Sequence, residues 1–207
     1  MKKIVYIDEE QGWHSTVYAA LSEKYELHIP EILPHDVSKI WDDIRDSQVA
    51  IIDFRLNENG NVAYTGDDVA KEIYKHNKHL PLFIITSYED NAIQECTGTQ
   101  SIRGKEMFTD PEQLVKLCHM IDSAISIYDK KKASYEDYIL HCQEKLAAGT
   151  SLTAEEEANK FDAELYLSEL NLDSTARACL INNGTSKNLA EMLELARTIV
   201  SNHCKKQ

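Results

Sequence analysis

Several side chains that could carry out chemistry follow apolar runs of the 207-residue chain. In sequence order they are Asp8-Glu9-Glu10, Asp53, Thr86-Ser87 and Lys105. Clustered carboxylates repel one another, and burying them without a counter-charge costs free energy. A divalent cation removes that cost, and Mg²⁺ suits a site made of oxygen ligands. Such a group fits phosphoryl transfer to a carboxylate oxygen, with a hydroxyl and an ammonium around the phosphoryl oxygens.

The strands and helices around these side chains are predicted from the apolar pattern. Strands are expected at Lys3–Ile7, Tyr25–Ile29, Val49–Asp53, Leu80–Thr86 and, more weakly, Ile102–Phe108. The first, third and fourth runs are nearly continuous, as in parallel strands buried on both faces. Helical patterns lie at Gly12–Lys24, Asp36–Asp46, Asp67–Asn77, Asn91–Cys96 and from Asp110 onward. This alternation predicts a doubly wound α/β domain, in which ligands bind beyond the carboxyl ends of the strands.

Four segments together resemble response-regulator receiver domains. They are Tyr6-Ile-Asp8-Glu9, Ile51-Ile-Asp53-Phe-Arg-Leu56, Pro81-Leu-Phe-Ile-Ile-Thr86-Ser87 and the region of Lys105. The resemblance covers about residues 1–127 and rests on the order of the motifs and the intervals between them. It implies a flavodoxin-like fold with a five-stranded parallel sheet.

The resemblance also implies roles for individual residues. Asp53 would accept a phosphoryl group from a sensor histidine kinase or a phosphotransfer protein. Thr86 would hydrogen-bond that group and shift on activation, and Lys105 would pair with Asp53 and its phosphate. The ligands of a Mg²⁺ ion would be Asp8, Glu9, Asp53 and the backbone carbonyl of Arg55. On the alternative reading, Asp8 and Asp53 are ordinary caps at the ends of strands, and Glu10 is read as a solvated helix start.

The sequence departs from the family pattern in several places. The loop 54–66 is longer than usual, so it could act as a lid or a partner contact. The fifth strand is weakly apolar, and two other registers would place Glu106 or Met107 at the lysine position. Phe108 is a candidate for the family's aromatic switch residue. Arg55 and Tyr88 occupy positions that influence acyl-phosphate hydrolysis in the family, and this bulky pair suggests a long-lived phosphoryl state.

The chain changes character after the predicted sheet. Apart from one step that Lys132 fills, apolar residues recur every three or four positions from Leu114 to Leu146. Asp110 and Pro111 are typical of a helix start and Gly149 of a stop. We therefore expect one continuous helix of nearly forty residues that joins the receiver to an all-α domain at residues 128–207. Thr153 and Glu156 fit a capping box. Further helices are expected from Asp173 and from Ser186.

Charge and composition limit the classes of function. The net charge is −13, with −10 on residues 1–128 (12 basic and 22 acidic) and −3 on residues 129–207 (10 basic and 13 acidic). Neither half offers a basic face for phosphates, which argues against DNA as a partner. No apolar run is long enough to span a membrane, and no signal peptide is evident, so a cytoplasmic location is expected. The five cysteines form no Cys-x-x-Cys pair, which indicates free thiols and no zinc site.

Four hypotheses describe what the second half does. In the first, the helical tail binds a protein partner or forms a homodimer, and phosphorylation changes that contact. In the second, the tail binds RNA, against which its acidity argues. The third is enzymatic, either an aspartyl-phosphate phosphohydrolase, which would need an aspartate where Arg55 stands, or a phosphotransfer tail using His141. In the fourth, the receiver is not phosphorylated and serves only for docking.

Overall fold

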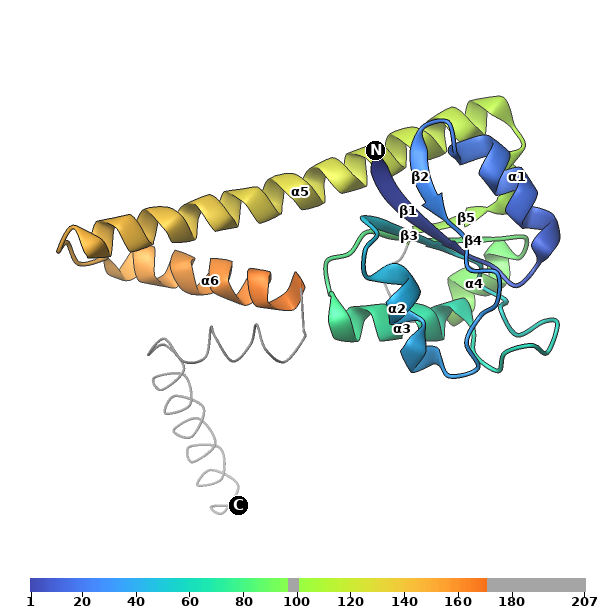
Figure 1. Cartoon of the computed structure of the whole chain (residues 1–207), viewed down its shortest axis with the longest axis horizontal. Coiled ribbons are helices and arrows are strands. Elements are labelled where there is room, and N and C mark those ends of the chain that lie inside the picture. The colour runs from blue at the N-terminus through green and yellow to red at the C-terminus, as the bar shows by residue number, and fades with distance from the viewer. Residues whose placement is uncertain (97–100, 171–207) are drawn as a thin grey trace, which may run out of the picture.

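The computed structural model of the chain describes residues 1–96 and 101–170. Five parallel strands form one sheet in the order β2-β1-β3-β4-β5. The strands are β1 (Lys2–Ile7), β2 (Tyr25–His28), β3 (Val49–Ile52), β4 (Leu82–Thr86) and β5 (Ser101–Gly104). Helices cover both faces of the sheet, and a long helix leaves it on one side (Figure 1). The expected doubly wound five-stranded fold is confirmed.

Alternation along the buried strands divides the core into two layers. In β1, Val5 and Ile7 point to one face, where they pack with α2 (Trp41–Ile44) and α3 (Gly66–His76). Ile4 and Tyr6 point to the other face, where they pack with α1 (Gln11–Leu21) and α5 (Pro111–Ala147). All four strand residues are fully buried.

Three predicted elements are corrected by the structure. The helix expected at Asp36–Asp46 is a single 3₁₀ turn, η1 (Val37–Lys39), followed by the short α2. The Asp36 carboxylate accepts a hydrogen bond from Ser38 N, which fixes that tight turn. The fifth strand ends at Gly104, and residues 105–108 form the 3₁₀ turn η2 (Lys105–Phe108). The fourth strand begins at Leu82 and not at Leu80.

The remaining helices of the α/β domain agree closely with expectation. Helix α3 begins behind a capping box in which Thr65 and Asp68 exchange hydrogen bonds. Helix α4 (Glu89–Glu95) follows β4. The boundaries differ from the predicted ones by a few residues, as expected for the ends of helices.

The predicted long helix is confirmed. Helix α5 covers 37 residues and begins where the Asp110 carboxylate accepts hydrogen bonds from the amides of Glu112 and Gln113. It ends before Gly149, whose φ of 78° is one that glycine adopts most easily. Because the helix is uninterrupted, its first half packs on the sheet and its second half projects beyond it (Figure 1).

Helix α6 (Ala154–Leu170) turns back along the projecting half of α5. The predicted capping box is present, since Thr153 N donates to Glu156 and Glu156 N donates to Thr153 Oγ1. Lys145 on α5 holds the same glutamate at 2.6 Å. Cys142, Ala163 and Tyr166 are the buried side chains between the two helices. The helices expected from Asp173 and Ser186 lie outside the described residues.

The end of α6 returns to the α/β domain. Glu169 lies 2.5 Å from Lys78 Nζ and 2.9 Å from His79 Nε2, both in the loop before β4. The amide of Lys78 also donates to the backbone carbonyl of Glu169 at 3.1 Å. The Tyr166 ring lies on that of His79, with centroids 4.1 Å apart. We call this set, Glu169 and Tyr166 with Lys78 and His79, the tail contact.

Candidate functional site

The side chains at the carboxyl ends of β1, β3 and β5 converge on one point. Lys105 Nζ lies 2.8 Å from Asp8 Oδ2 and 3.2 Å from Asp53 Oδ1. Each of these side chains is at most 5 % exposed. Of the three candidates for the lysine position, Lys105 is therefore the residue that reaches the carboxylates, whereas Glu106 is exposed and Met107 lies in the core.

Three carboxylates at this point have the arrangement of a metal site. Oxygen atoms of Asp8, Glu9 and Asp53 lie within 4.8 Å of one another. Glu9 Oε2 is buried and has no hydrogen-bond partner among the described residues. A buried, unpaired carboxylate oxygen is costly unless a cation or a proton meets it. The residues therefore fit a divalent cation with oxygen ligands. We call Asp8, Glu9, Asp53 and Lys105 the acidic site.

The pKa values record the excess of negative charge. Burial raises the pKa of Asp53 to about 6, against the opposing effect of the Lys105 ammonium. Burial also raises the pKa of Glu9 to about 7, and the charges of Asp8 and Asp53 add to that shift. One ammonium thus does not balance three carboxylates, and a further positive charge would favour their ionised forms.

The backbone around Asp53 holds its carboxylate in place. The Arg55 amide donates to Asp53 Oδ2 at 3.0 Å, and the Asp53 amide donates to Ile7 O at 2.8 Å. Gly66 passes so close that a Cβ at that position would lie 2.2 Å from the Asp53 carbonyl oxygen. The Arg55 carbonyl, the fourth predicted metal ligand, accepts a hydrogen bond from the Glu58 amide at 3.3 Å.

Thr86 ends β4 and is fully buried. Its hydroxyl oxygen accepts a hydrogen bond from the amide of Tyr88 at 3.2 Å. The Arg55 guanidinium stacks on the Tyr88 ring, 3.8 Å from the centroid, and Glu58 pairs with both side chains. The loops after β3 and β4 are therefore joined by side chains at positions next to the acidic site.

The long loop after Asp53 is anchored to the core. Leu56, Val62 and Tyr64 are buried, and the Tyr64 hydroxyl donates to Pro34 O at 2.7 Å. A cavity of about 440 Å³ opens between this loop and the start of α1, and Asp8 and Glu9 line one side of it. The acidic site is thus accessible beside the loop.

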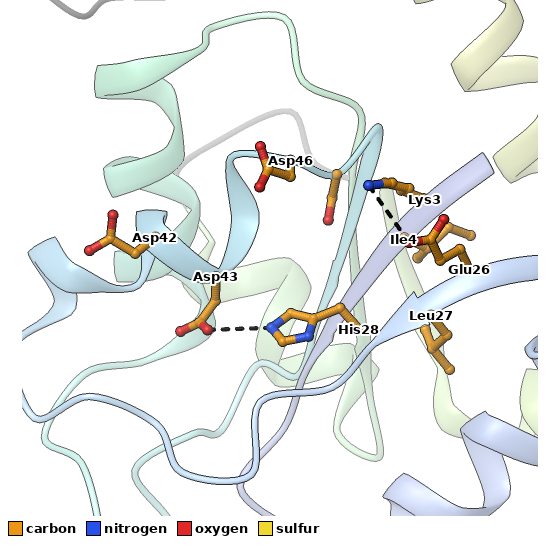
Figure 2. Close-up of a pocket in the computed structure, with 9 residues that line it drawn as sticks. Lys3, Ile4, Glu26, Leu27, His28, Asp42, Asp43 and Asp46 are labelled. Atoms are coloured by element: carbon orange, nitrogen blue, oxygen red, sulfur yellow. Dashed lines mark hydrogen bonds and ion pairs between the residues drawn. The ribbon is translucent and has the colours of Figure 1, made fainter. Parts of the chain in front are cut away.

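A second cavity, of about 400 Å³, is lined by residues of β1, β2, α2 and the segment after α2 (Figure 2). It carries acidic residues from α2 and the segment after it, and four of its charged or titratable groups form two pairs. Asp43 lies 3.3 Å from His28, and Lys3 lies 3.6 Å from Glu26 (Figure 2). This cavity lacks the convergent buried groups of the acidic site.

The contacts of three residues near the acidic site were not predicted from the sequence. The buried Tyr6 hydroxyl donates a hydrogen bond to Asp8. Trp13 on α1 lies under Lys105, with Nζ 5.4 Å from the ring centroid. Gly66 makes the close approach described above. In sequence each of the three is an ordinary strand, helix or turn residue, although the alternation that puts Tyr6 and Asp8 on one face of β1 was a usable signal.

Two other predicted features can be placed. His141, the candidate for phosphotransfer, is exposed on α5, and Lys145, one turn later, is engaged by Glu156. Glu10, expected as a solvated helix start, is the exposed residue before α1 and lies 3.9 Å from Lys105. Among the described residues, no helix is both long enough and apolar enough to cross a bilayer.

No protein-family model and no curated protein matches the sequence. Among solved structures, the chain is similar to NtrX from Brucella abortus in complex with ADP, at 20% identity and a TM-score of 0.50, over 65% of this chain and 30% of that one. A response regulator receiver domain protein from Clostridium thermocellum matches at 22% identity and a TM-score of 0.48, over 62% and 98% of the two chains. TrrA from Thermotoga maritima, in complex with Mg²⁺-BeF, matches at 20% identity and a TM-score of 0.46, over 57% and 98%.

At these identities the likeness concerns the fold. The strand order β2-β1-β3-β4-β5 is that of flavodoxin-like proteins, which bind their ligands at the carboxyl edge of the sheet. The α/β part of the chain has the receiver fold of response regulators.

Proposed function

We propose that this protein is a response regulator whose Asp53 accepts a phosphoryl group in a Mg²⁺-dependent reaction. One observation carries the proposal, namely that the Asp53 carboxylate shares a buried position with Asp8 and the Lys105 ammonium, beside an unpaired oxygen of Glu9. Perturbed carboxylates around one ammonium, at the carboxyl edge of such a sheet, are typical of a functional site. The proposed phosphodonor is a sensor histidine kinase or a phosphotransfer protein.

In the proposed reaction an Asp53 oxygen forms a bond to phosphorus while the bond from phosphorus to the donor's imidazole nitrogen breaks. The imidazole keeps the electron pair of that bond. The Arg55 amide holds one Asp53 oxygen, and the Lys105 ammonium lies at the other. A Mg²⁺ ion held by Asp8, Glu9, Asp53 and the Arg55 carbonyl supplies positive charge that offsets the phosphoryl oxygens. Thr86 is the hydroxyl donor that we assign to those oxygens.

The test is labelling with radioactive acetyl phosphate. Wild type is expected to take up label in Mg²⁺ and none in EDTA, and Asp53→Asn is expected to take up none. Asp122→Asn is the matched control. Asp122 is an aspartate on α5 that forms ion pairs with Lys2 and Lys24. It should label like wild type. Equal labelling of Asp53→Asn would overturn the site assignment, and failure of wild type to label would favour a docking module.

The tail is the proposed output, through contact with a protein. Only two residues separate the start of helix α5 from η2, which carries Lys105, and α5 runs without a break to the hairpin with α6. A shift at the acidic site therefore has a continuous helix on which to act. The homodimer is tested first, by light scattering of the full chain with and without beryllofluoride. An unchanged monomer would exclude the homodimer and leave another protein as the partner.

A further inference from the structure

Tyr6 places a hydroxyl group beside the acidic site from within the core. It lies two residues before Asp8 on β1, so both side chains extend from the same face of the strand. The ring is fully buried, and its edge meets the Phe108 ring with centroids 5.6 Å apart. From this fixed position the hydroxyl donates a hydrogen bond to Asp8 Oδ2.

Asp8 receives three hydrogen-bond donors of different kinds. The Glu10 amide donates to Oδ1 at 2.9 Å, and the Lys105 ammonium lies 2.8 Å from Oδ2, the oxygen that Tyr6 also contacts. The ammonium is at the end of a flexible side chain and is shared with Asp53. The Tyr6 hydroxyl is on a rigid ring held by the core, and Asp8 is its partner. Of the two donors to Oδ2, only the lysine can move to another group without disturbing the core.

The hydroxyl is not needed to fill the core. A phenylalanine would occupy the same space and keep the edge-to-face contact with Phe108, and it would require no polar partner. The phenol of a tyrosine is protonated near neutral pH, so the hydroxyl is a hydrogen-bond donor to Asp8. A permanent donor to a carboxylate fixes the orientation of that carboxylate.

We propose that Tyr6 is a positioning residue for the binding of the divalent cation. The Tyr6 hydroxyl holds the Asp8 carboxylate in the orientation that binds the metal. This inference rests on the proposed function, because it assigns a role to Tyr6 only if Asp8 is a metal ligand. Groups that hydrogen-bond to metal ligands commonly change metal affinity by about 10- to 100-fold when they are removed. Without the hydroxyl, Asp8 Oδ2 keeps only the Lys105 ammonium as a donor, and the carboxylate is free to turn with that flexible side chain.

The experiment compares Tyr6→Phe with Tyr25→Phe in the full chain. Tyr25 is also buried on the α5 side of the sheet, and its hydroxyl also contacts an aspartate, Asp122, at 3.2 Å. Calorimetric titration with MgCl₂ gives the Kd, and thermal unfolding in EDTA gives the stability without metal. Tyr6→Phe is expected to weaken Mg²⁺ binding by about tenfold or more. Tyr25→Phe is expected to lower the unfolding temperature without changing the Kd.

The outcomes separate the two proposals. If wild type binds Mg²⁺ and Tyr6→Phe binds it equally well or more tightly, the role of Tyr6 is overturned and the proposed function stands. If wild type does not bind Mg²⁺, both proposals are overturned. A loss of affinity equal in both variants would show a general effect of core damage and would also overturn the role of Tyr6. Tyr6→Leu, which likewise lacks the donor, serves as the second variant and should show the same loss.

Discussion

The acidic site and the tail contact use similar charged groups at opposite ends of the sheet. At the carboxyl ends of the strands, Lys105 meets Asp8 and Asp53, with every side chain at most 5 % exposed. At the amino end of β4, Glu169 meets Lys78 and His79, whose side chains are 20 to 52 % exposed. The chemical groups are alike, but their surroundings and their charge balance differ.

This difference explains why one cluster suits chemistry and the other suits attachment. The acidic site holds three carboxylates for one ammonium, and among the described residues an oxygen of Glu9 has no hydrogen-bond partner. It gains from a further cation. The tail contact balances one carboxylate with one lysine and a histidine, so it is complete without a ligand. Water screens its charges, and its strength is small.

The two clusters are expected to differ most in the effect of removing the lysine from each. Lys105→Met leaves buried carboxylates without their counter-charge, which costs about 3–5 kcal/mol in comparable pairs. We expect a loss of unfolding free energy of that order in EDTA, largely restored by Mg²⁺. Urea unfolding with and without the metal measures both effects.

Lys78→Met is the matched control for that experiment. Its lysine is half exposed, so the expected loss is at most about 1 kcal/mol and does not depend on Mg²⁺. If Lys105→Met were as stable as wild type in EDTA, the account of the acidic site as a cluster that needs positive charge would be wrong.

A second change tests how closely the backbone holds Asp53. Gly66→Ala would place its Cβ 2.2 Å from the Asp53 carbonyl oxygen, so the start of α3 or the Asp53 backbone must move. We expect a loss of about 1–3 kcal/mol, together with reduced labelling by acetyl phosphate. Thermal unfolding and the labelling assay measure the two effects.

Gly60→Ala provides the comparison. Gly60 has a φ of 73°, and in the part of the chain that the structure describes no atom lies within 4 Å of its missing Cβ. Alanine there strains the turn without touching Asp53. It should cost about 1 kcal/mol and leave labelling unchanged. Normal labelling of a folded Gly66→Ala would contradict the idea that Gly66 positions Asp53.

A third prediction concerns Arg55, Tyr88 and Glu58, which lie next to the acidic site. Arg55 stacks on Tyr88 and lies 3.7 Å from Glu58, and we expect this group to slow the attack of water on phosphorylated Asp53. Arg55→Ala should shorten the phosphoryl lifetime several-fold, measured as decay of label after the donor is removed. Arg45→Ala, which removes a surface arginine paired with Asp42, should leave the lifetime unchanged. A lifetime of seconds in wild type would already count against this expectation.

Much of the acidic site was predictable because its residues follow buried strands. Continuous apolar runs identify parallel strands, and the topology of such sheets brings their carboxyl ends together. Asp8 and Asp53 were therefore expected near one another, with Lys105 beside them if that residue, and not Glu106 or Met107, held the lysine position. The long helix was predictable from its apolar period, in which Lys132 fills the one missing step, and from the lack of glycine and proline between Pro111 and Gly149.

Other features left little or no usable pattern in the sequence. The expected helix at Asp36–Asp46 had a suitable period, but a local turn set by the Asp36 carboxylate divides it. Gly66 is special only because Asp53 passes beside it in three dimensions. The partners Lys78 and Glu169 lie 91 positions apart, and charged residues of this kind are common on any surface.

The smallest expected effect is at the tail contact, where Glu169→Gln removes the charge and keeps the shape. Lys78 is the main cause that lowers the pKa of Glu169. The ionised Glu169 carboxylate therefore stabilises the fold at pH values above its pKa in the unfolded chain. This stabilisation is lost as the pH falls through its pKa in the folded chain. We expect a loss of at most about 1 kcal/mol near neutral pH, faster amide hydrogen exchange in α6, and unchanged labelling of Asp53. The difference in stability from wild type should disappear in strong acid, where the glutamate of wild type is protonated and is as neutral as the glutamine of the variant. If the substitution altered the labelling of Asp53, the two clusters would be coupled through the sheet. The tail contact would then take part in signalling from Asp53 and not only attach the tail.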